Sequence, residues 1–292
     1  MAHQAGYVNI IGRPNVGKST LLNALLGEKL VIVNPKAQTT RHRILGILNG
    51  EDHQLVLSDT PGILEPQYEL HTNMMHAVDE ALRDADILLV MVEVGEVPER
   101  SANVVERAAR FKGPMVVLVN KIDQAAQEAI APALQAWQEA FPQAKVVPLS
   151  ALHGFNVEEL RTHLIAQLPE HPPYFPKDEM SDRDMRFFVS EIIREKILEI
   201  YQQEIPYSTQ VVVNSYEETP EILRIQADVI AMRESQKGIL IGRGGGVLRQ
   251  LGTVSRKAIE RFTGSKVFLD LRVKVDPDWR GDVAKLKKYG YR

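Results

Sequence analysis

Short apolar runs, separated by longer amphipathic stretches, make up the first half of the chain. Four of these runs are rich in Val, Ile and Leu, as in strands that are buried on both faces, and lie at 7–11, 87–92, 115–119 and 145–149. Segments with apolar residues at helical spacing follow the strands, at 20–27, 69–84, 100–111, 126–140 and 156–168. A further pair of strands, 44–48 and 54–57, flanks a polar turn. This alternation predicts a doubly wound α/β domain.

A different pattern begins after residue 168. Four prolines within the nine residues 168–176 predict a semi-rigid connector, so we expect a first domain at 1–168, a linker at 169–181 and a second domain at 182–292. The expected elements of the second domain are helix 182–203, strands 210–215 and 222–232, helix 247–262 and strand 266–275. This order of elements predicts a small α+β domain.

A glycine-rich loop joins the first strand to the first helix. It fits the pattern G-x-x-x-x-G-K-[ST] with the residues Gly12, Arg13, Pro14, Asn15, Val16, Gly17, Lys18 and Ser19. The glycines let backbone N–H groups turn toward a phosphate, and the helix N-terminus adds its positive dipole end. Lys18 is expected to reach the β- and γ-phosphates, and the Ser19 hydroxyl to bind Mg²⁺. On its own this loop suits ATP as well as GTP.

Two further motifs follow strands of the same domain. The strand 54–57 leads into Asp59, Thr60, Pro61 and Gly62. A carboxylate placed there holds Mg²⁺, and the glycine N–H meets the γ-phosphate. The strand 115–119 leads into Asn120, Lys121, Ile122 and Asp123, and the last strand leads into Ser150, Ala151 and Leu152. The Asp123 carboxylate can accept both N1–H and the exocyclic amine of guanine, and adenine has no matching pair of donors. We therefore expect GTP and GDP as ligands, with the Ser150–Leu152 backbone contacting the guanine oxygen.

The composition fits a soluble two-domain protein. The chain has 292 residues, 44% hydrophobic and 25% charged. It has no cysteine, which excludes disulfides and thiolate metal sites and suits a reducing cytosol. No apolar run approaches the roughly 18 residues of a membrane span, and no secretory signal is visible.

Charge is distributed unevenly along the chain. Residues 1–176 hold 14 basic against 20 acidic side chains, whereas residues 237–292 hold 14 basic against 5 acidic. A basic tail indicates contact with a polyanion, although a solvated basic surface has the same composition. The last stretch, 279–288, has the pattern of a short basic amphipathic helix, which could cover a binding groove or touch a membrane surface.

A second glycine-rich loop lies in this basic region. The segment Ile241, Gly242, Arg243, Gly244 and Gly245 contains G-x-x-G between two expected short helices, the second at 247–262, so the elements follow the order helix–strand–strand–helix–helix–strand. Together with the order of elements, it resembles the type II KH domain, in which such a loop clamps the backbone of about four nucleotides. Lys237 and Arg249 are further candidates for phosphate contacts. Gly244 stands where KH loops usually carry a second basic residue, which favours weaker binding.

The order and spacing of the nucleotide motifs resemble those of the translation-factor class of GTPases. Asn15 in the phosphate loop, the Thr-Thr-Arg at 39–41 and the motif at 59–62 narrow the resemblance to the TrmE–Era–septin group. The resemblance implies that Thr40, or its neighbour Thr39, completes the Mg²⁺ coordination. It also implies that Asn15 can hold a K⁺ ion that stabilises charge, so Lys18, Thr40 and Asn15 are the expected catalytic residues. Ile63 stands where Ras-like proteins carry a water-orienting glutamine, so we expect slow intrinsic hydrolysis.

A GTPase domain, a proline-rich linker and a type II KH domain in this order resemble the Era family, as does the helix sequence at 190–196. The resemblance implies a monomeric cytoplasmic GTPase that binds 16S ribosomal RNA near its 3′ end. It further implies a role in assembly of the 30S subunit and peripheral association with the inner face of the cell membrane. Two alternatives stay open: another GTPase of the same group acting on the large subunit or on tRNA modification, and a non-enzymatic RNA-binding scaffold with structural GTP.

Overall fold

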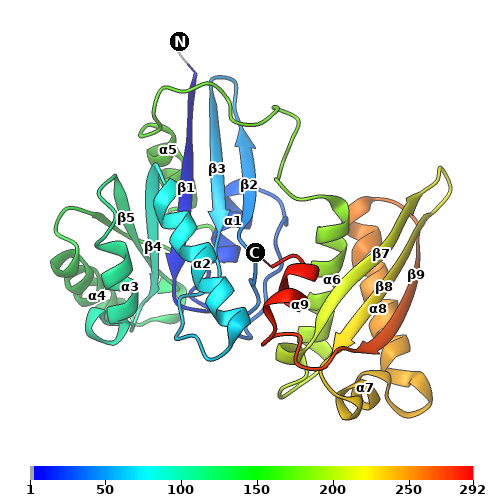
Figure 1. Cartoon of the computed structure of the whole chain (residues 1–292). Helices are drawn as coiled ribbons and strands as arrows, with labels where there is room; N and C mark the ends of the chain where they lie inside the picture. The colour runs from blue at the N-terminus through cyan, green and yellow to red at the C-terminus, as the bar shows by residue number, and fades with distance from the viewer. Residues whose placement is uncertain (1–2, 292) are drawn as a thin grey trace. The chain divides into compact units, whose positions relative to one another are not determined.

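The computed structural model describes residues 3–291 and divides them into two compact units (Figure 1). The first unit contains the residues up to 182 apart from 68–70, and the second contains 68–70 and the residues from 183 onward.

The first unit is built on a six-stranded sheet with the order β2-β3-β1-β4-β5-β6. Its strands are β1 (Gln4–Gly12), β2 (Ile44–Asn49), β3 (His53–Asp59), β4 (Ile87–Glu93), β5 (Met115–Asn120) and β6 (Lys145–Pro148). Only β2 runs antiparallel to its neighbour, and it forms one edge of the sheet. The helices are α1 (Lys18–Leu26), α2 (Glu69–Asp84), α3 (Ala102–Ala108), α4 (Gln127–Ala140) and α5 (Val157–Ile165), with 3₁₀ turns η1 (Pro98–Ser101) and η2 (Ile122–Gln124).

The core of this sheet explains why its strands are continuous apolar runs. Every residue of β4 from Ile87 to Val92 is buried, as expected for a central strand of a parallel sheet that is covered on both faces. The predicted doubly wound α/β domain is confirmed. The helix expected at 100–111 is shorter in the structure. Residues 98–101 form a 3₁₀ turn that begins at Pro98, and the α-helix α3 runs only from Ala102 to Ala108.

The proline-rich segment does not leave the first unit where its composition suggested. Contacts group the residues up to 182 with the first unit, and residues 179–182 run antiparallel along the outer edge of β2. An edge strand presents unpaired N–H and C=O groups, and this segment supplies partners for them. The stretch 169–182 is therefore a part of the first unit's surface.

The second unit is a three-stranded sheet covered by helices. Its strands are β7 (Gln210–Glu218), β8 (Leu223–Ala231) and β9 (Val267–Val275), with β8 in the middle, antiparallel to β7 and parallel to β9. The other elements are α6 (Met185–Ile200), η3 (Pro206–Ser208), α7 (Glu234–Ile241), η4 (Arg243–Gly245), α8 (Gly246–Thr263) and α9 (Val283–Lys288). Apolar residues of α6, α8 and the sheet form one core. The helix–strand–strand–helix–helix–strand order expected of a type II KH domain is confirmed.

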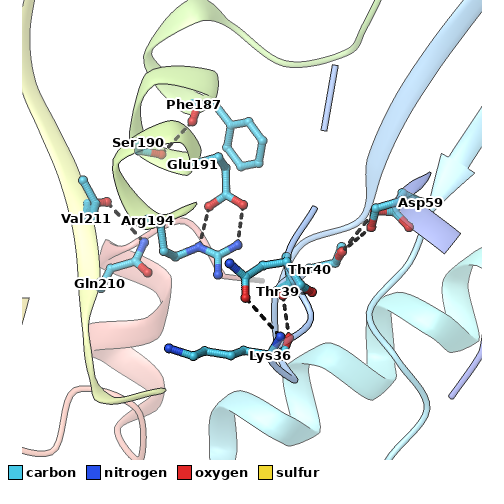
Figure 2. Close-up of polar contacts among 12 residues, drawn as sticks. Lys36, Thr39, Thr40, Asp59, Phe187, Ser190, Glu191, Arg194, Gln210 and Val211 are labelled. Carbon is cyan, nitrogen blue, oxygen red and sulfur yellow. Dashed lines mark hydrogen bonds and ion pairs between the residues drawn. The ribbon is translucent and has the colours of Figure 1, made fainter. Parts of the chain in front are cut away.

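Polar anchors hold the helices of the second unit in place. On α6, the Arg194 guanidinium donates two hydrogen bonds to the Glu191 carboxylate, at 2.8 and 2.5 Å (Figure 2). Such a bidentate pair matches two opposite charges on the buried side of a mostly apolar helix face. The Tyr201 hydroxyl donates to the Leu240 carbonyl at 2.8 Å, which ties the end of α6 to the end of α7.

The short basic amphipathic helix expected at 279–288 is present as α9, but it begins only at Val283. The helix α9 is short, and the side chain of Trp279 ahead of it is fully buried, with its indole N–H donating to the Ser208 carbonyl at 3.0 Å. Tyr291 after the helix donates from its hydroxyl to Gln210 Oε1 at 2.9 Å. The apolar side of the tail is thus used for packing within its own unit. Among residues 3–291, no helix has the length and apolar character needed to cross a membrane.

Candidate nucleotide and RNA sites

The phosphate loop turns between β1 and α1 with the backbone that its glycines permit. Gly17 has a φ of 107°, and a Cβ at this position would lie 2.4 Å from Asn120 Nδ2. Asn15 also has a positive φ, of 66°, in a region that Asn tolerates better than most residues. The loop thus directs backbone N–H groups and the N-terminus of α1 toward one point, which is the geometry that binds a phosphate.

Lys18 lies at the start of α1 with its ammonium group folded back on the loop. Its Nζ donates to the Arg13 carbonyl at 2.9 Å and to the Gly12 carbonyl at 3.4 Å. Burial lowers the pKa of Lys18 to about 8, against the opposing effects of the Asp59 and Glu96 carboxylates. A buried ammonium held by carbonyl groups is ready to be attracted by the charge of a polyphosphate.

Three oxygen-bearing side chains meet beside the loop. Ser19 Oγ donates to Asp59 Oδ2 at 2.7 Å, and the Ser19 and Thr40 hydroxyls are 3.0 Å apart. Thr40 Oγ1 donates to the same carboxylate oxygen at 3.0 Å (Figure 2). Asp59 is fully buried, and burial is the largest cause of its raised pKa. Within the described part of the chain its Oδ1 has no hydrogen-bond partner. Hydroxyl and carboxylate oxygens are the ligands that Mg²⁺ takes in nucleotide sites, so this set fits that ion.

The same geometry separates the two neighbouring threonines. Thr39 Oγ1 donates to the carbonyls of Asn34 and Lys36, at 3.2 and 2.6 Å, within its own loop. Only Thr40 turns its hydroxyl to Asp59 (Figure 2). The arrangement therefore favours Thr40 as the residue that completes the Mg²⁺ site.

Hydrogen bonds hold the segment after Asp59 against the end of β1 and the start of the phosphate loop. The Thr60 hydroxyl donates to the Ile10 carbonyl at 2.6 Å, and the Ile63 N–H donates to the Gly12 carbonyl at 2.9 Å. A Cβ on Gly62 would lie 2.6 Å from the backbone of Pro14, so only glycine lets these two segments approach this closely. The Ile63 side chain is buried and apolar, and it offers no group that could orient a water molecule.

The base end of the site is a cavity of about 290 Å³ lined by the phosphate loop, by the loop 33–40 and by Asn120, Lys121, Asp123 and Leu152. The Asp123 carboxylate is held from one side by Ser150 Oγ, which donates to its Oδ1 at 2.6 Å. Lys121 pairs with Glu93 at 2.5 Å. These contacts orient the carboxylate that is expected to read guanine.

Asn120 has a role that the motif did not indicate. Its amide donates from Nδ2 to the Val16 carbonyl at 2.7 Å, and its Oδ1 accepts from the Ala151 N–H at 3.0 Å. All of these atoms are buried. Asn120 therefore ties the phosphate loop to the loop at 150–152, rather than facing the base. Val33 and Gln38 also line the cavity and were missed, because the Thr-Thr-Arg motif of that loop begins only at Thr39.

The second glycine-rich loop joins α7 to α8. Gly242, Gly244 and Gly245 have φ angles of 72°, 59° and 74°, and a Cβ on Gly242 would lie 2.3 Å from the Val247 side chain. The loop is consequently narrow, and it ends at the N-terminus of an 18-residue helix. A phosphate backbone can approach such a loop closely.

The candidate RNA contacts are placed around this loop. Arg243 and Arg249 are exposed, and Ile239, on α7 ahead of the loop, exposes 54% of its surface. Lys237 is held loosely by Glu234 at 3.8 Å, whereas Ile241 is partly buried. The structure thus gathers the predicted basic residues at the α7–α8 end of the unit and adds Ile239, an exposed apolar group suited to a base. The sequence offered no reason to distinguish Ile239 from a core residue of α7.

The fold and the two loops together define a P-loop GTPase that carries a type II KH domain. Residues 7–121 match the family model described as "50S ribosome-binding GTPase", and residues 204–280 match the model described as "KH domain". The chain is 42% identical to "GTPase Era" of Staphylococcus haemolyticus, over 99% of this chain and 97% of that one. It is 43% identical to "GTPase ERA-like, chloroplastic" of Oryza sativa, over 99% of this chain and 70% of the relative.

Solved structures agree with these relatives. A crystal structure of Era in complex with MgGDPNP and nucleotides 1506–1542 of 16S ribosomal RNA is 37% identical, with a TM-score of 0.94 over 99% of both chains. A variant of Aquifex aeolicus Era bound to GDP and aluminium fluoride gives the same values. The chain belongs to the Era family of GTPases, which bind guanine nucleotide with Mg²⁺.

Proposed function

We propose that the protein is a GTP-driven switch that binds 16S ribosomal RNA near its 3′ end and acts in assembly of the small ribosomal subunit. The observation that supports this most is the pairing of a complete phosphate loop with a narrow G-x-x-G loop, in a chain that aligns over its whole length with Era bound to such RNA. The alternatives, another GTPase of the same group acting on the large subunit or on tRNA modification, are less well supported, because the full-length relatives reported above are Era proteins.

Nucleotide binding is assigned to the residues of the first unit. The contacts to the phosphates come from the loop Gly12–Ser19, with Lys18 reaching the β- and γ-phosphates. Guanine is read by Asp123, with Lys121 beside it and the Ser150–Leu152 backbone at the base oxygen. Ser19, Thr40 and Asp59 hold Mg²⁺, which neutralises phosphate charge, and the Gly62 N–H meets the γ-phosphate.

Hydrolysis is proposed to be slow without a partner. The chain supplies Lys18, the Thr40 hydroxyl and Asn15 at the phosphates, and Ile63 replaces the glutamine that would orient the attacking water. Asn15 is exposed in the phosphate loop with its side chain available to a K⁺ ion. Turnover in potassium and in sodium tests this role, and equal rates in the two salts would remove it.

RNA binding is assigned to the loop 241–245 with Lys237 and Arg249. We propose that hydrolysis of GTP releases the segments around Thr40 and Gly62 and thereby changes the affinity for RNA. The test is the affinity for an RNA containing the 3′ end of 16S rRNA, measured with GDP and with a non-hydrolysable GTP analogue. Equal affinities would contradict the switch. Turnover that neither this RNA nor 30S subunits change would favour the scaffold alternative.

We further propose that the protein is a cytoplasmic monomer with peripheral association at the inner face of the membrane. The support for membrane contact is limited to the exposed basic side of α9, at Lys287 and Lys288, because the apolar side of the tail is packed in its own unit. Co-sedimentation with anionic vesicles at low and at high salt tests this, since purely electrostatic binding is lost at high salt.

A further inference from the structure

The proline-rich segment makes side-chain contacts with β2 that a mere connector does not need. Leu45 is the key residue of the strand, because both of its backbone groups point away from β3. Its N–H donates to Asp182 Oδ1 at 3.1 Å, and its carbonyl accepts from Ser181 Oγ at 2.6 Å. One residue pair further along, the Ile47 N–H donates to the Met180 carbonyl at 2.9 Å. We call residues 179–182 the strap.

A buried glutamine holds the proline-rich segment upstream of the strap, at residues 174 and 175. The Gln54 side chain on β3 accepts from the N–H groups of Tyr174 and Phe175 at 2.7 and 3.0 Å, and it donates to the Phe175 carbonyl at 2.8 Å. Lys177 donates to the carbonyls of the β2–β3 turn, at Gly50 and Glu51. The whole segment therefore follows the β2–β3 hairpin, as the green trace beyond α5 shows (Figure 1).

This hairpin carries the Mg²⁺ side chains at its opposite end. Thr40 precedes β2 by four residues, and Asp59 is the last residue of β3 and pairs with Ile44 in register. Thr40 and Asp59 are hydrogen-bonded to each other, so the strap contacts β2 one residue away from Ile44, the register partner of the side chain that would respond to loss of the γ-phosphate. A shift of β2 along β3 would carry Leu45 with it and would break or remake its two bonds to the strap.

The chain leaves little slack after the strap. Asp184 caps α6 by accepting from the Phe187 N–H at 2.9 Å, and α6 begins at Met185. Two residues, Arg183 and Asp184, separate Asp182 from Met185 at the start of the first helix of the second unit, a reach of at most about 10 Å. A displacement of Asp182 must therefore move the start of α6 or strain the chain between them.

We propose that Ser181 and Asp182 are positioning residues that couple the nucleotide state of the hairpin to the RNA affinity of the second unit. This rests on the proposed nucleotide-dependent binding of RNA. The arrangement with Thr40 at Asp59 is the one in which the strap is engaged, so the strap holds in the GTP state and loosens in the GDP state. The coupling acts through the covalent chain and through named hydrogen bonds at the edge of β2.

The test measures one ratio, the affinity for the 3′-end RNA with a GTP analogue divided by that with GDP, in the full-length protein. D182A removes the acceptor for the Leu45 N–H. We expect the ratio of the two affinities to come about fivefold closer to one, because the loss of one hydrogen bond changes an equilibrium by about that factor. D182N keeps an oxygen at the same position, and we expect it to retain the wild-type ratio. D178A is the matched control, because Asp178 is an exposed acidic residue of the same segment.

A second readout follows the strap itself. The backbone N–H groups of Leu45 and Ile47 point away from β3 and toward the strap, so their amide exchange reports the strap. The N–H groups of Gly46 and Leu48 point toward β3, so their exchange reports the pairing of β2 with β3. We expect faster exchange at Leu45 and Ile47 with GDP than with the GTP analogue. A wild-type ratio of one would overturn the switch and the coupling with it. A wild-type ratio that D182A leaves unchanged, or exchange at Leu45 that ignores the nucleotide, would overturn the strap alone.

Discussion

Replacing Asn120 by alanine distinguishes a structural tie from a contact to the base. The substitution removes the hydrogen bonds to the Val16 carbonyl and from the Ala151 N–H, at 2.7 and 3.0 Å. Both partners are buried, and an unsatisfied buried group costs about 1–3 kcal/mol. The two losses together predict a decrease of about 2–6 kcal/mol, shared between the stability of the nucleotide-free protein and its affinity for nucleotide.

The assay combines two measurements on N120A. Urea unfolding of the nucleotide-free protein gives the loss of stability, and calorimetric titration with GDP and IDP gives affinity and base preference. Inosine lacks the exocyclic amine of guanine, so a residue that contacts this amine changes the ratio of the two affinities. We expect N120A to lose stability and to weaken both nucleotides alike, whereas D123A weakens GDP more than IDP and has little effect on unfolding.

The exposed neighbour Gln124, which also lines the cavity, provides the control, and Q124A should leave stability within about 0.5 kcal/mol of the wild type. The reasoning would be refuted if N120A kept the wild-type stability and lost only the preference for GDP over IDP. Asn120 would then be a reader of the base, and the two hydrogen bonds would contribute nothing measurable.

Three further predictions follow from the two sites. Because the pKa of Lys18 is lowered from its ordinary value to about 8, its charge is lost as the pH rises through 8, and a bound polyphosphate raises that pKa again. We expect GDP affinity to fall above about pH 8 with uptake of a proton on binding, measured by calorimetry in buffers of different ionisation enthalpy; pH-independent affinity up to pH 10 would contradict this. D59N should abolish the Mg²⁺ dependence of nucleotide affinity, and an unchanged Mg²⁺ titration would rule out the assigned site. G242A places a Cβ 2.3 Å from the Val247 side chain at a positive φ, so the affinity for RNA should fall at least tenfold. GTP turnover in the absence of RNA should stay unchanged. G238A is the control, because a Cβ there meets open space, and it should bind RNA as the wild type does.

Sequence patterns predicted most of the first unit because its strands are buried on both faces. A central strand such as β4 must be apolar throughout, and the motifs at 12–19, 59–62 and 120–123 mark the ends of such strands. The order of elements in the type II KH domain was also predictable. Its helices and strands differ in the spacing of their apolar residues, and the glycines at 242–245 mark the loop between two helices.

Features that depend on partners far along the chain were not predictable. The proline-rich segment looked like a linker because nothing in its composition indicates that Ser181 and Asp182 fit the free edge of β2. The tail at 279–288 had the pattern of a short basic amphipathic helix, and the burial of Trp279 against Ser208 is a tertiary contact with no local signature. Thr39 and Thr40 are chemically equivalent in sequence, and only the direction of their hydroxyls separates them.

The most direct test of the central claim is crosslinking of the GTP-loaded protein to ribosomal RNA, followed by sequencing of the crosslinked sites. The account predicts crosslinks from the loop 241–245 to the 3′ end of 16S rRNA, and their loss in G242A. Crosslinks that map to large-subunit RNA or to tRNA, or that are spread evenly over 16S rRNA, would contradict it.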